Sequence, residues 1–343
     1  MSIPTIEQVP AISDMSIWES AEPLSLLISG ELEKRWANGS SLVDSICHYA
    51  LVPTGKLIRP ILLLDSALAV GGNLSCVIPA AVGAECGHVA SLIHDDIIDA
   101  DDLRRGRPSV QHRYGIGDAI VAGDALIFDL FAGLAECRSA GAPDNRVVAA
   151  LHAVARAGLD LCRGQSLESE LTRNPRFDPE AYLDVARLKT ASFFRGACES
   201  GAILGGGSAE SVAALRTYGD LLGTAFQIHD DLLMYLSDSQ TTGKPQASDV
   251  QNGRLTLPVI LAYESAQSWE RELVERALRG QDEPAHALAN LCEVVRRTGA
   301  VDAAVKRARD LAGEARQALR ILSPTPSRDR LDCFATLAIK RDR

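Results

Sequence analysis

The sequence has few aromatic residues, no excess of positive charge and no paired cysteine motif. Aromatic residues make up 5% of the 343 residues, and alternating runs of β-branched residues are scarce, which argues against a β-rich fold. The 35 lysines and arginines face 45 aspartates and glutamates, a formal net charge of −10. Nucleic acids and anionic membranes attract positive surfaces, so this balance argues against a general binder of either. It leaves cations as natural partners.

Cysteine spacing and hydropathy exclude further classes. None of the eight cysteines forms a CxxC pair, and their scatter indicates neither a zinc site nor a disulfide framework. The first twenty residues contain three acids and no apolar core, which argues against a secretory signal. No uninterrupted apolar run reaches about 18 residues, so no membrane span is expected. These features together predict a cytoplasmic protein with reduced thiols.

What the sequence does contain is helical periodicity. Alanine and leucine dominate, and apolar residues recur at a spacing near 3.6 in seven segments: 24–36, 77–98, 124–134, 146–161, 183–204, 212–236 and 301–322. The strand-like stretch Leu255–Leu261 contains Pro258, which fits the first turn of a helix better than a central strand. No Pro/Gly/Ser-rich linker divides the chain. We therefore predict an all-α fold, with a loose N-terminal arm over residues 1–20 and one large helical domain over residues 21–343.

A first acidic cluster ends one of these apolar segments. Five aspartates lie within eight positions, in the run His94-Asp95-Asp96-Ile97-Ile98-Asp99-Ala100-Asp101-Asp102. Asp95 and Asp99 are four residues apart and share a helix face, where like charges cost stability unless cations lie there. Magnesium, which binds one or two carboxylates together with phosphate oxygens and water, fits this pattern. The alternative is a solvated helix end, which the two isoleucines disfavour.

A second acidic cluster, Gln227-Ile228-His229-Asp230-Asp231, also follows an apolar helical stretch. Gln227 precedes the two aspartates by three and four residues, so all three side chains can line one edge of a groove. Two aspartate pairs on separate apolar helices predict two walls of a cavity in a helical bundle, with metal between them.

Basic residues accompany both clusters. They occur in the segments Gly55-Lys56-Leu57-Ile58-Arg59-Pro60, Arg104-Arg105-Gly106-Arg107, Lys189-Thr190 and at Lys244. Arginine suits bidentate contacts to phosphate, whereas lysine supplies a mobile point charge. Solvated charge runs are the ordinary alternative for such residues. Acid pairs for magnesium beside separate basic groups predict a substrate that carries a diphosphate, and two basic sets suit two such substrates.

These motifs occur in the same order as in a known enzyme family. The sequence resembles the trans-isoprenyl (E-polyprenyl) diphosphate synthases over roughly residues 51–261. The likeness rests on Gly55-Lys56-x-x-Arg59-Pro60, His88 with His94-Asp95-Asp96-x-x-Asp99, Asp102-Leu103-Arg104-Arg105-Gly106-x-Pro108, Gly123-Asp124-Ala125-Leu126, Gly164-Gln165, Lys189-Thr190-Ala191, Phe226-Gln227-x-x-Asp230-Asp231, Gly243-Lys244-Pro245 and Thr256-Leu257-Pro258.

The resemblance implies an all-α homodimer of the isoprenoid synthase type, with a deep central cavity between the two aspartate helices. It implies head-to-tail (1'-4) condensation of isopentenyl diphosphate with an allylic prenyl diphosphate. Metal ions and fixed cations stabilise the leaving diphosphate as the allylic C–O bond breaks. The departing diphosphate takes the proton lost after the π-bond attacks, so no histidine or glutamate base is expected.

The resemblance also assigns residue roles. Three Mg²⁺ ions per active site are expected on Asp95, Asp96, Asp99 and Asp230. Gln227 and Asp231 support that site, and Thr190 stabilises the cation. The allylic diphosphate is contacted by Arg104, Lys189 and Lys244, and the isopentenyl diphosphate site consists of Lys56, Arg59, His88 and Arg105.

The sequence departs from the family pattern at three places. Met234 stands where the second motif normally ends in aspartate, so one outer carboxylate is missing. Arg254, a further expected substrate contact, replaces a frequent lysine and keeps its charge. Ala247-Ser248 replaces the usual glycine step before Asp249. The loss at position 234 predicts weaker binding of one Mg²⁺ ion while turnover is retained.

Small residues upstream of Asp95 bear on product length. Gly87, Ala90 and Ser91 lie one to two helical turns before it, and one turn rises about 5.4 Å, comparable with one extended isoprene unit. Side chains of this size leave a channel for a growing tail, which predicts a product of geranylgeranyl length or longer. Phe128 on the next helix is a candidate floor of that channel. Close packing between helices is the alternative explanation for the small residues.

Two rival functions remain at this stage. A class I terpene cyclase ionises an allylic diphosphate at a similar aspartate cluster but needs no isopentenyl diphosphate site, so the retained basic residues disfavour it. A non-catalytic regulatory subunit is favoured by Met234 and disfavoured by the complete first motif.

Overall fold

Helices account for nearly all of the regular structure. The computed structural model describes residues 17–37, 39–236 and 252–339. Within these ranges the only strands are two strands of two residues each, which form one hairpin. The predicted all-α fold is confirmed. The chain divides into two compact units: unit 1 comprises residues 1–156, 193–219 and 318–334, and unit 2 comprises residues 157–192, 220–317 and 335–343.

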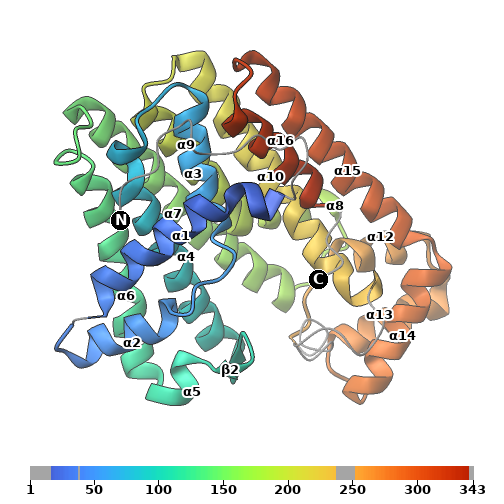
Figure 1. Cartoon of the computed structure of the whole chain (residues 1–343). Helices are drawn as coiled ribbons and strands as arrows, with labels where there is room; N and C mark the ends of the chain where they lie inside the picture. Colours follow the sequence, from blue (N-terminus) through green and yellow to red (C-terminus); the bar gives the residue numbers. More distant parts are fainter. Residues whose placement is uncertain (1–16, 38, 237–251, 340–343) are drawn as a thin grey trace. The chain divides into compact units, whose positions relative to one another are not determined.

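Unit 1 is built around α4, which packs against α3 and α6. Its elements are α1 (Ile17–Trp36), α2 (Leu42–Leu51), α3 (Ile58–Ala69), α4 (Leu74–Asp99), β1 (Leu103–Arg104), β2 (Arg107–Pro108), α5 (Val110–Tyr114), α6 (Ile116–Glu136), η4 (Leu319–Ile321), most of α9 (Ser192–Gly205) and parts of α7 (Asp144–Arg173), α10 (Ala209–Leu236) and α16 (Pro326–Leu337). Figure 1 shows α4 beside α6.

Small residues allow α4 and α6 to approach closely. A side chain at Gly83 would meet the backbone oxygen of Leu130 at 2.8 Å, and one at Gly133 would meet the backbone oxygen of Pro79 at 2.4 Å. These two glycines therefore serve helix packing. Among the described helices, α4 is also the one long and apolar enough to cross a membrane, but 67% of its most apolar window is buried. It is the core helix of unit 1.

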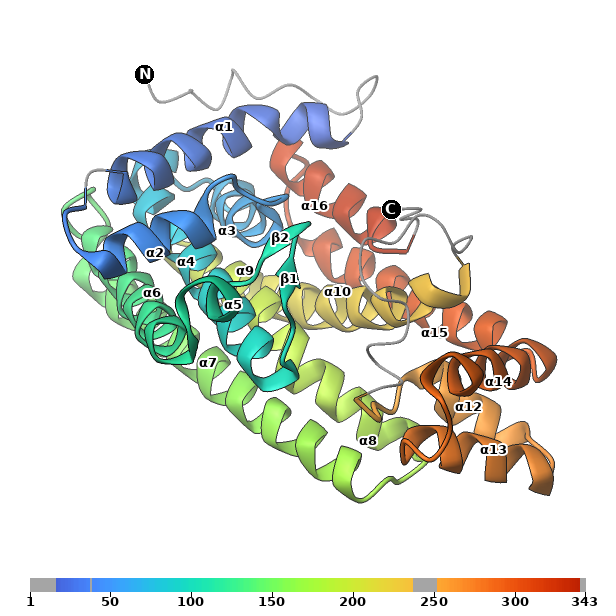
Figure 2. The ribbon, with the colours of Figure 1, turned by 90° about the horizontal axis from the view of Figure 1, so that it is seen from below.

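The β1–β2 hairpin follows α4 and lies next to α5 (Figure 2). Leu103 pairs with Pro108 and Arg104 with Arg107 in an antiparallel register. The two loop residues, Arg105 and Gly106, have φ values of 53° and 75°. Positive φ at both central residues gives the loop a twist that matches the twist of the paired strands. The hairpin therefore folds the basic segment Arg104–Arg107 back toward the end of α4.

Unit 2 contains the remaining helices. They are α8 (Pro179–Val185), the π-helical turn η3 (Ala186–Ala191), α12 (Leu257–Ser265), α13 (Ser268–Leu278), α14 (Pro284–Arg297) and α15 (Ala300–Ala318), together with the later parts of α7 and α10. One apolar cluster joins α8, α10, α12 and α15 through Tyr182, Ile228, Ile260 and Ala308. A second cluster joins α12, α13 and α14. Pro258 lies in the first turn of α12, as predicted.

Several predicted boundaries differ from the structure. Helix α1 begins at Ile17, so residues 17–20 are helical where the sequence predicts a loose arm; residues 1–16 lie outside the described ranges. The segment 183–204, predicted as one helix, consists of α8, η3 and α9. The prediction of a single domain over residues 21–343 remains a prediction.

Candidate active site

The first acidic cluster begins in the last turn of α4, which ends at Asp99, and continues into the segment after the helix. Asp95 and Asp99 are half-buried and one turn apart, whereas Asp96 is only 2% exposed. Both Nε, at 2.8 Å, and Nη2 of Arg104 donate hydrogen bonds to Oδ1 of Asp96. Hydrogen bonds of this charge-assisted kind are among the strong ones in proteins. The arrangement does not support Asp96 as a direct metal ligand, because its carboxylate is buried against the guanidinium of Arg104.

The turn after α4 explains how Arg104 reaches Asp96. Ala100 has a φ of 55°, a left-handed conformation that ends the helix. Gln111 of α5 then donates from Nε2 to the backbone oxygens of Asp96, at 2.7 Å, and of Asp101, at 3.0 Å. The Asp96 carbonyl also accepts from the backbone N–H of Asp101 at 2.9 Å, so Gln111 ties the end of α4 to the turn that follows it. No motif in the sequence indicated Gln111.

The four residues expected to bind isopentenyl diphosphate all lie in unit 1, and two of them, Arg59 and His88, are in direct contact. Arg59 Nη1 lies 3.2 Å from Nε2 of His88, and the Arg59 guanidinium stacks 4.5 Å above the Phe194 ring. The Arg105 guanidinium lies so close to Gly55 that a Cβ there would meet Nη2 at 2.5 Å. Lys56 Nζ lies 5.8 Å from the Trp18 ring centroid.

The position of this basic group suits an anion. Helix α3 begins at Ile58, so Lys56 and Arg59 flank its N-terminus. The unpaired N–H groups and the dipole of a helix N-terminus favour negative charge. Pro60 fits within this first turn because its missing N–H has no partner to lose there.

Two titratable side chains complete the group. Burial lowers the pKa of His88 well below its usual value, and the positive charges of Arg59, Arg105 and Arg104 lower it further. Because guanidinium only donates, Nε2 of His88 accepts from Arg59 and the imidazole is neutral. Glu85, 2% exposed, has a raised pKa because of burial, an effect that Arg105 and Arg59 oppose. Glu85 belongs to none of the motifs found in the sequence.

In unit 2, Lys189 is held by an acid that the sequence analysis missed. Glu168 of α7 accepts from Lys189 Nζ at 2.5 Å, and Arg254 Nε lies 3.9 Å from the same carboxylate oxygen. Lys189 and Thr190 lie on η3, and π-helical turns occur often at functional sites. A Cβ at Gly164 would meet the backbone nitrogen of Lys189 at 2.3 Å, so only glycine allows α7 to approach η3 this closely.

The second acidic cluster lies on α10. Asp230 is exposed, whereas Asp231 is buried and accepts hydrogen bonds from Gln227 Nε2 at 2.8 Å and Tyr182 Oη at 2.6 Å. Gln227 Oε1 accepts from Thr190 at 2.6 Å. The predicted support role of Gln227 and Asp231 is compatible with this geometry, and Tyr182 is a further member that the sequence analysis missed.

The donor set fits a hard divalent cation. Among the described residues, no three histidine, cysteine or acidic side chains are grouped closely enough to form a protein-only metal cage. Magnesium does not require one, because it commonly binds one or two carboxylates and completes its shell with substrate phosphates and water. Asp95 and Asp99 offer oxygen ligands on one face of α4. The cavity expected between the two aspartate helices remains a prediction.

The residues assigned to product length have different environments. A Cβ at Gly87 would meet Leu130 Cδ2 at 2.8 Å and Phe193 Cε1 at 3.1 Å, which favours the alternative of close packing at this position. Ala90 is fully buried, and Ser91 Oγ donates to the backbone oxygen of His88. Phe128 is 74% exposed. Leu130 and Phe193 are the side chains at Gly87, and the role of Phe128 as a channel floor stays a prediction.

Two further predictions concern α10 and the segment after it. Met234 is half-buried and packs against the apolar cluster that joins α12, α13 and α14. Its side chain thus has a packing role at the position where the family usually has aspartate. Lys244, with Ala247, Ser248 and Asp249, lies outside the described residues.

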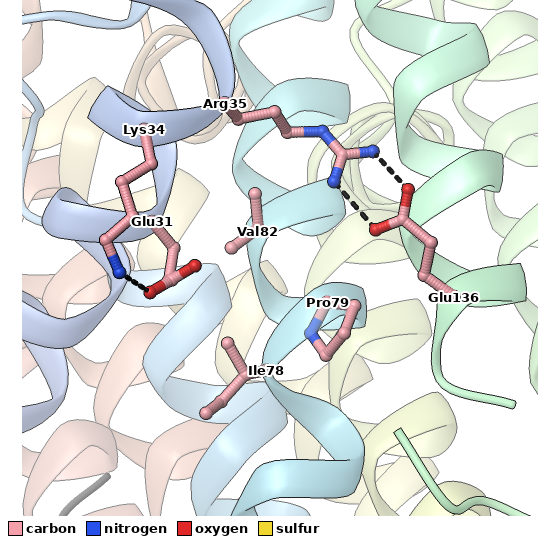
Figure 3. Close-up of a pocket in the computed structure, with 7 residues that line it drawn as sticks. All are labelled: Glu31, Lys34, Arg35, Ile78, Pro79, Val82 and Glu136. Atoms are coloured by element: carbon pink, nitrogen blue, oxygen red, sulfur yellow. Dashed lines mark hydrogen bonds and ion pairs between the residues drawn. The ribbon is translucent and has the colours of Figure 1, made fainter. Parts of the chain in front are cut away.

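Unit 1 also has a small pocket among α1, α4 and α6. It has a volume of about 250 Å³, and its lining includes Glu31, Arg35, Val82 and Glu136 (Figure 3). The Arg35 guanidinium donates to both carboxylate oxygens of Glu136 at 2.8 Å. Because this bidentate pair and the ion pair between Lys34 and Glu31 neutralise the charged side chains at the pocket, we assign no part of the reaction to it.

Comparisons with known proteins identify the family. Residues 40–295 match the family model for polyprenyl synthetase. The chain belongs to the polyprenyl synthetase family. It is 37% identical to the short chain isoprenyl diphosphate synthase of Methanothermobacter thermautotrophicus, over 86% of this chain and 89% of that protein.

Two other family members span a range of named activities. The octaprenyl diphosphate synthase of Escherichia coli is 31% identical over 88% of this chain and 91% of its own length. The crystal structure of the polyprenyl synthase of Caulobacter crescentus, complexed with calcium and isoprenyl diphosphate, matches with a TM-score of 0.87 and 26% identity over the full length of both chains. The family resemblance found from the motifs is confirmed.

Proposed function

We propose that this polyprenyl synthetase family member condenses isopentenyl diphosphate head-to-tail (1'-4) with an allylic prenyl diphosphate and releases diphosphate. The observation that carries the proposal is the basic group of unit 1, in which Arg59 contacts His88 and Arg105 lies against Gly55 at the N-terminus of α3. A cyclase that uses the allylic substrate alone has no need of this group. The activities named for the related proteins support the same reaction.

The allylic diphosphate binds the acidic clusters through divalent cations. Asp95, Asp99 and Asp230 are the ligands we assign, and Asp96 instead orients Arg104 toward the same diphosphate. A bound divalent cation supplies neutralisation of the charge that develops on the leaving diphosphate. The calcium and isoprenyl diphosphate bound by the related Caulobacter protein support this assignment. Three Mg²⁺ ions per site remain our expectation.

Basic side chains bind the leaving diphosphate at the allylic centre, and a threonine stabilises the carbocation. Lys189, held by Glu168, contributes a fixed positive charge to the leaving diphosphate, and Lys244 and Arg254 are assigned to the same substrate. Thr190 stabilises the carbocation with its hydroxyl oxygen or backbone carbonyl. The departing diphosphate removes the proton, so His88, which is neutral, binds substrate and is not a base.

The product has geranylgeranyl length or more and all-trans geometry. Ala90 is fully buried one turn before the aspartates, and Ser91 is also small, so neither residue closes the path of a growing tail with an aromatic ring. Leu130 and Phe193 contact the position of Gly87 two turns back, and the role of Phe128 stays a prediction. The related proteins carry names that range from short chain to octaprenyl.

We also propose that the chain is a cytoplasmic homodimer. On α6, Val121 and Phe128 lie on the same helix face and are 56% and 74% exposed, an apolar face that a second copy would cover. None of the eight cysteines is in a disulfide, which supports a reducing compartment. Sedimentation should give a dimer for the wild type and a monomer for Phe128→Glu. A wild-type monomer would contradict the dimer.

A three-arm incubation of the purified chain tests the reaction. With Mg²⁺, the allylic diphosphate alone should be unchanged, isopentenyl diphosphate alone should be unchanged, and the two together should yield longer prenyl diphosphates and inorganic diphosphate. Cyclised hydrocarbon from the allylic substrate alone would establish the cyclase. No turnover in any arm, restored by a second prenyl synthase subunit, would establish the regulatory subunit.

A further inference from the structure

A chain of short hydrogen bonds in unit 2 links a buried tyrosine to the second acidic cluster. Tyr182 of α8 is 6% exposed and donates from Oη to Oδ2 of Asp231 at 2.6 Å. Gln227 donates from Nε2 to the other oxygen, Oδ1, at 2.8 Å. Thr190 on η3 donates to Oε1 of Gln227 at 2.6 Å. Three separate elements therefore meet at one carboxylate and one amide.

The direction of every hydrogen in this chain follows from the carboxylate. An ionised carboxylate only accepts, so Tyr182 and Gln227 must both donate to Asp231. Gln227 must then present its NH₂ group to Asp231 and its carbonyl oxygen to Thr190. That oxygen accepts, so the Thr190 hydroxyl donates its single hydrogen to Gln227. The lone pairs of the Thr190 hydroxyl oxygen are left for a positive centre.

We propose that Tyr182 is a positioning residue for the reaction. Its hydroxyl fixes the rotamer of Asp231, which fixes the orientation of Gln227, which in turn sets the polarity of the Thr190 hydroxyl. This role rests on the proposed function, in which Asp230 holds a cation and Thr190 faces the allylic carbocation. Tyr182 itself touches neither substrate nor metal. Partners of this outer kind typically change metal affinity or activity by about 10-fold to 100-fold when they are removed.

The ring of Tyr182 packs in the core and its hydroxyl makes the hydrogen bond, so a substitution can test one contribution without the other. Its ring belongs to the apolar cluster with Leu183, Ile228 and Leu232. Phenylalanine keeps that ring and removes only the hydroxyl, so Tyr182→Phe tests the hydrogen bond with little change in volume. Tyr218 provides a matched control on the same helix as Asp231: it is fully buried and donates to the backbone oxygen of Leu331 at 2.6 Å.

The test measures binding as well as turnover. An allylic thiolodiphosphate, in which sulfur replaces the bridging oxygen and ionisation is blocked, is titrated calorimetrically into wild type, Tyr182→Phe and Tyr218→Phe at several Mg²⁺ concentrations. We expect Tyr182→Phe to weaken the Mg²⁺-dependent binding about 10-fold, because the carboxylate beside Asp230 loses one of its donors. Tyr218→Phe should stay within twofold of wild type. The KM for isopentenyl diphosphate should be unchanged in both variants.

A double-mutant cycle with Thr190→Val separates positioning from a structural role. If the bonds act as one relay, the loss of kcat caused by Tyr182→Phe shrinks when Thr190 already lacks its hydroxyl, whereas independent effects add. Should Tyr182→Phe fail to fold, Gln227→Met breaks the relay one bond farther on and must give the same loss of analogue binding.

Three results would overturn the inference. Wild-type binding by Tyr182→Phe, equal losses in the two tyrosine variants, or additive losses with Thr190→Val would each contradict the relay while leaving the reaction intact. Failure of the wild-type chain to bind the analogue with Mg²⁺ or to elongate prenyl diphosphates would instead overturn the proposed function, and the inference with it.

Discussion

Two ionisable residues of unit 1, Glu85 and His88, lie on one helix beside the same arginines, and burial shifts their pKa values in opposite directions. Burial raises the pKa of the Glu85 carboxyl, and Arg105 and Arg59 only partly oppose that effect. The pKa of His88 is instead lowered, by burial and by three arginines. Both shifts favour the neutral form of the side chain. The preference of both side chains for the neutral form should be visible in the pH dependence of stability and of substrate binding.

Glu85→Gln should stabilise the protein at high pH. The raised pKa means that the folded state prefers the protonated carboxyl, so wild type loses stability as pH rises above about 4.5, the unfolded value, through the folded pKa. Glutamine does not ionise and avoids this loss. Urea unfolding at pH 5 and pH 8 should show a difference between Glu85→Gln and wild type that grows with pH in favour of glutamine. A difference that shrinks with pH would show that the arginines outweigh burial.

His88 should stay neutral throughout the working range. A lowered pKa leaves the neutral form dominant above 6.5, and stability is lost progressively as pH falls below 6.5, the unfolded value, through the lower folded pKa. Glutamine can accept the same hydrogen bond from Arg59, so His88→Gln should keep the KM for isopentenyl diphosphate within about threefold. The ratio of the KM of His88→Gln to the KM of wild type, both for isopentenyl diphosphate, should be constant from pH 6 to 8. A ratio that changes near pH 6.5 would mean that His88 titrates there.

At the scale of single elements, the close approach of α7 to η3 positions Lys189. Gly164→Ala would place a Cβ against backbone atoms of Lys189 and Leu188, at 2.3 and 2.7 Å. Forcing atoms into a packed contact typically costs about 1–3 kcal/mol. We expect a loss of that size in urea unfolding, together with a lower kcat because Lys189 moves.

Gly158 is the matched control for this substitution. It lies on the same helix, and a Cβ there would meet nothing within 4 Å. Gly158→Ala should raise stability by up to about 1 kcal/mol, since alanine is the better helix former. Equal stability changes in the two variants would contradict the close contact at Gly164.

Helix α4 should set product length through its buried face. Ala90→Phe introduces an aromatic ring one turn before Asp95 and should shorten the product. Leu130→Ala removes the side chain nearest to Gly87 and should lengthen it. Chromatography of the dephosphorylated products measures both shifts. An unchanged chain-length distribution in Ala90→Phe would rule out this face as the ruler.

Position 234 on α10 offers a test of the incomplete second motif. Met234 follows Asp230 by one turn and packs partly against apolar residues. Met234→Asp would add an acidic oxygen donor near Asp230, so the Mg²⁺ concentration for half-maximal velocity should fall severalfold, with some loss of stability from the broken packing. An unchanged Mg²⁺ requirement would show that position 234 makes no contribution to metal binding.

The sequence predicted helices well and their interruptions poorly. Apolar periodicity predicted α7, α10 and α15 because each buries one stripe of side chains. It missed η3, since one π-helical turn at Lys189 and Thr190 barely changes the apolar spacing and carries no glycine or proline. It also missed the hairpin, because strands of two residues are too short to show an alternation.

The same limit applies to the candidate site. Motif spacing predicted the charged residues of each cluster, but not which charges neutralise one another. Asp96 with Arg104 and Glu168 with Lys189 are pairings set by the turn after α4 and by the approach of α7 to η3. Tyr182 carried no signal in the sequence, because an isolated tyrosine at an apolar position is an ordinary core residue.

At the scale of the whole molecule, the net charge of −10 is compatible with anionic substrates because charge is distributed locally. Lys56, Arg59 and Arg105 form a positive group in unit 1, with a neutral histidine and a buried carboxyl whose raised pKa favours its neutral form. The central claim is that this group binds the diphosphate of isopentenyl diphosphate and not that of the allylic substrate.

Steady-state kinetics of Arg59→Gln test that claim most directly. Hydrogen bonds to charged groups are worth about 1.5–3 kcal/mol, so the KM for isopentenyl diphosphate should rise at least about tenfold while the KM for the allylic diphosphate stays within twofold. Arg113→Gln is the control, since that guanidinium lies over the rings of Tyr49 and Tyr114 and should leave both KM values unchanged. A rise in the allylic KM alone, or an equal rise in both, would contradict the account.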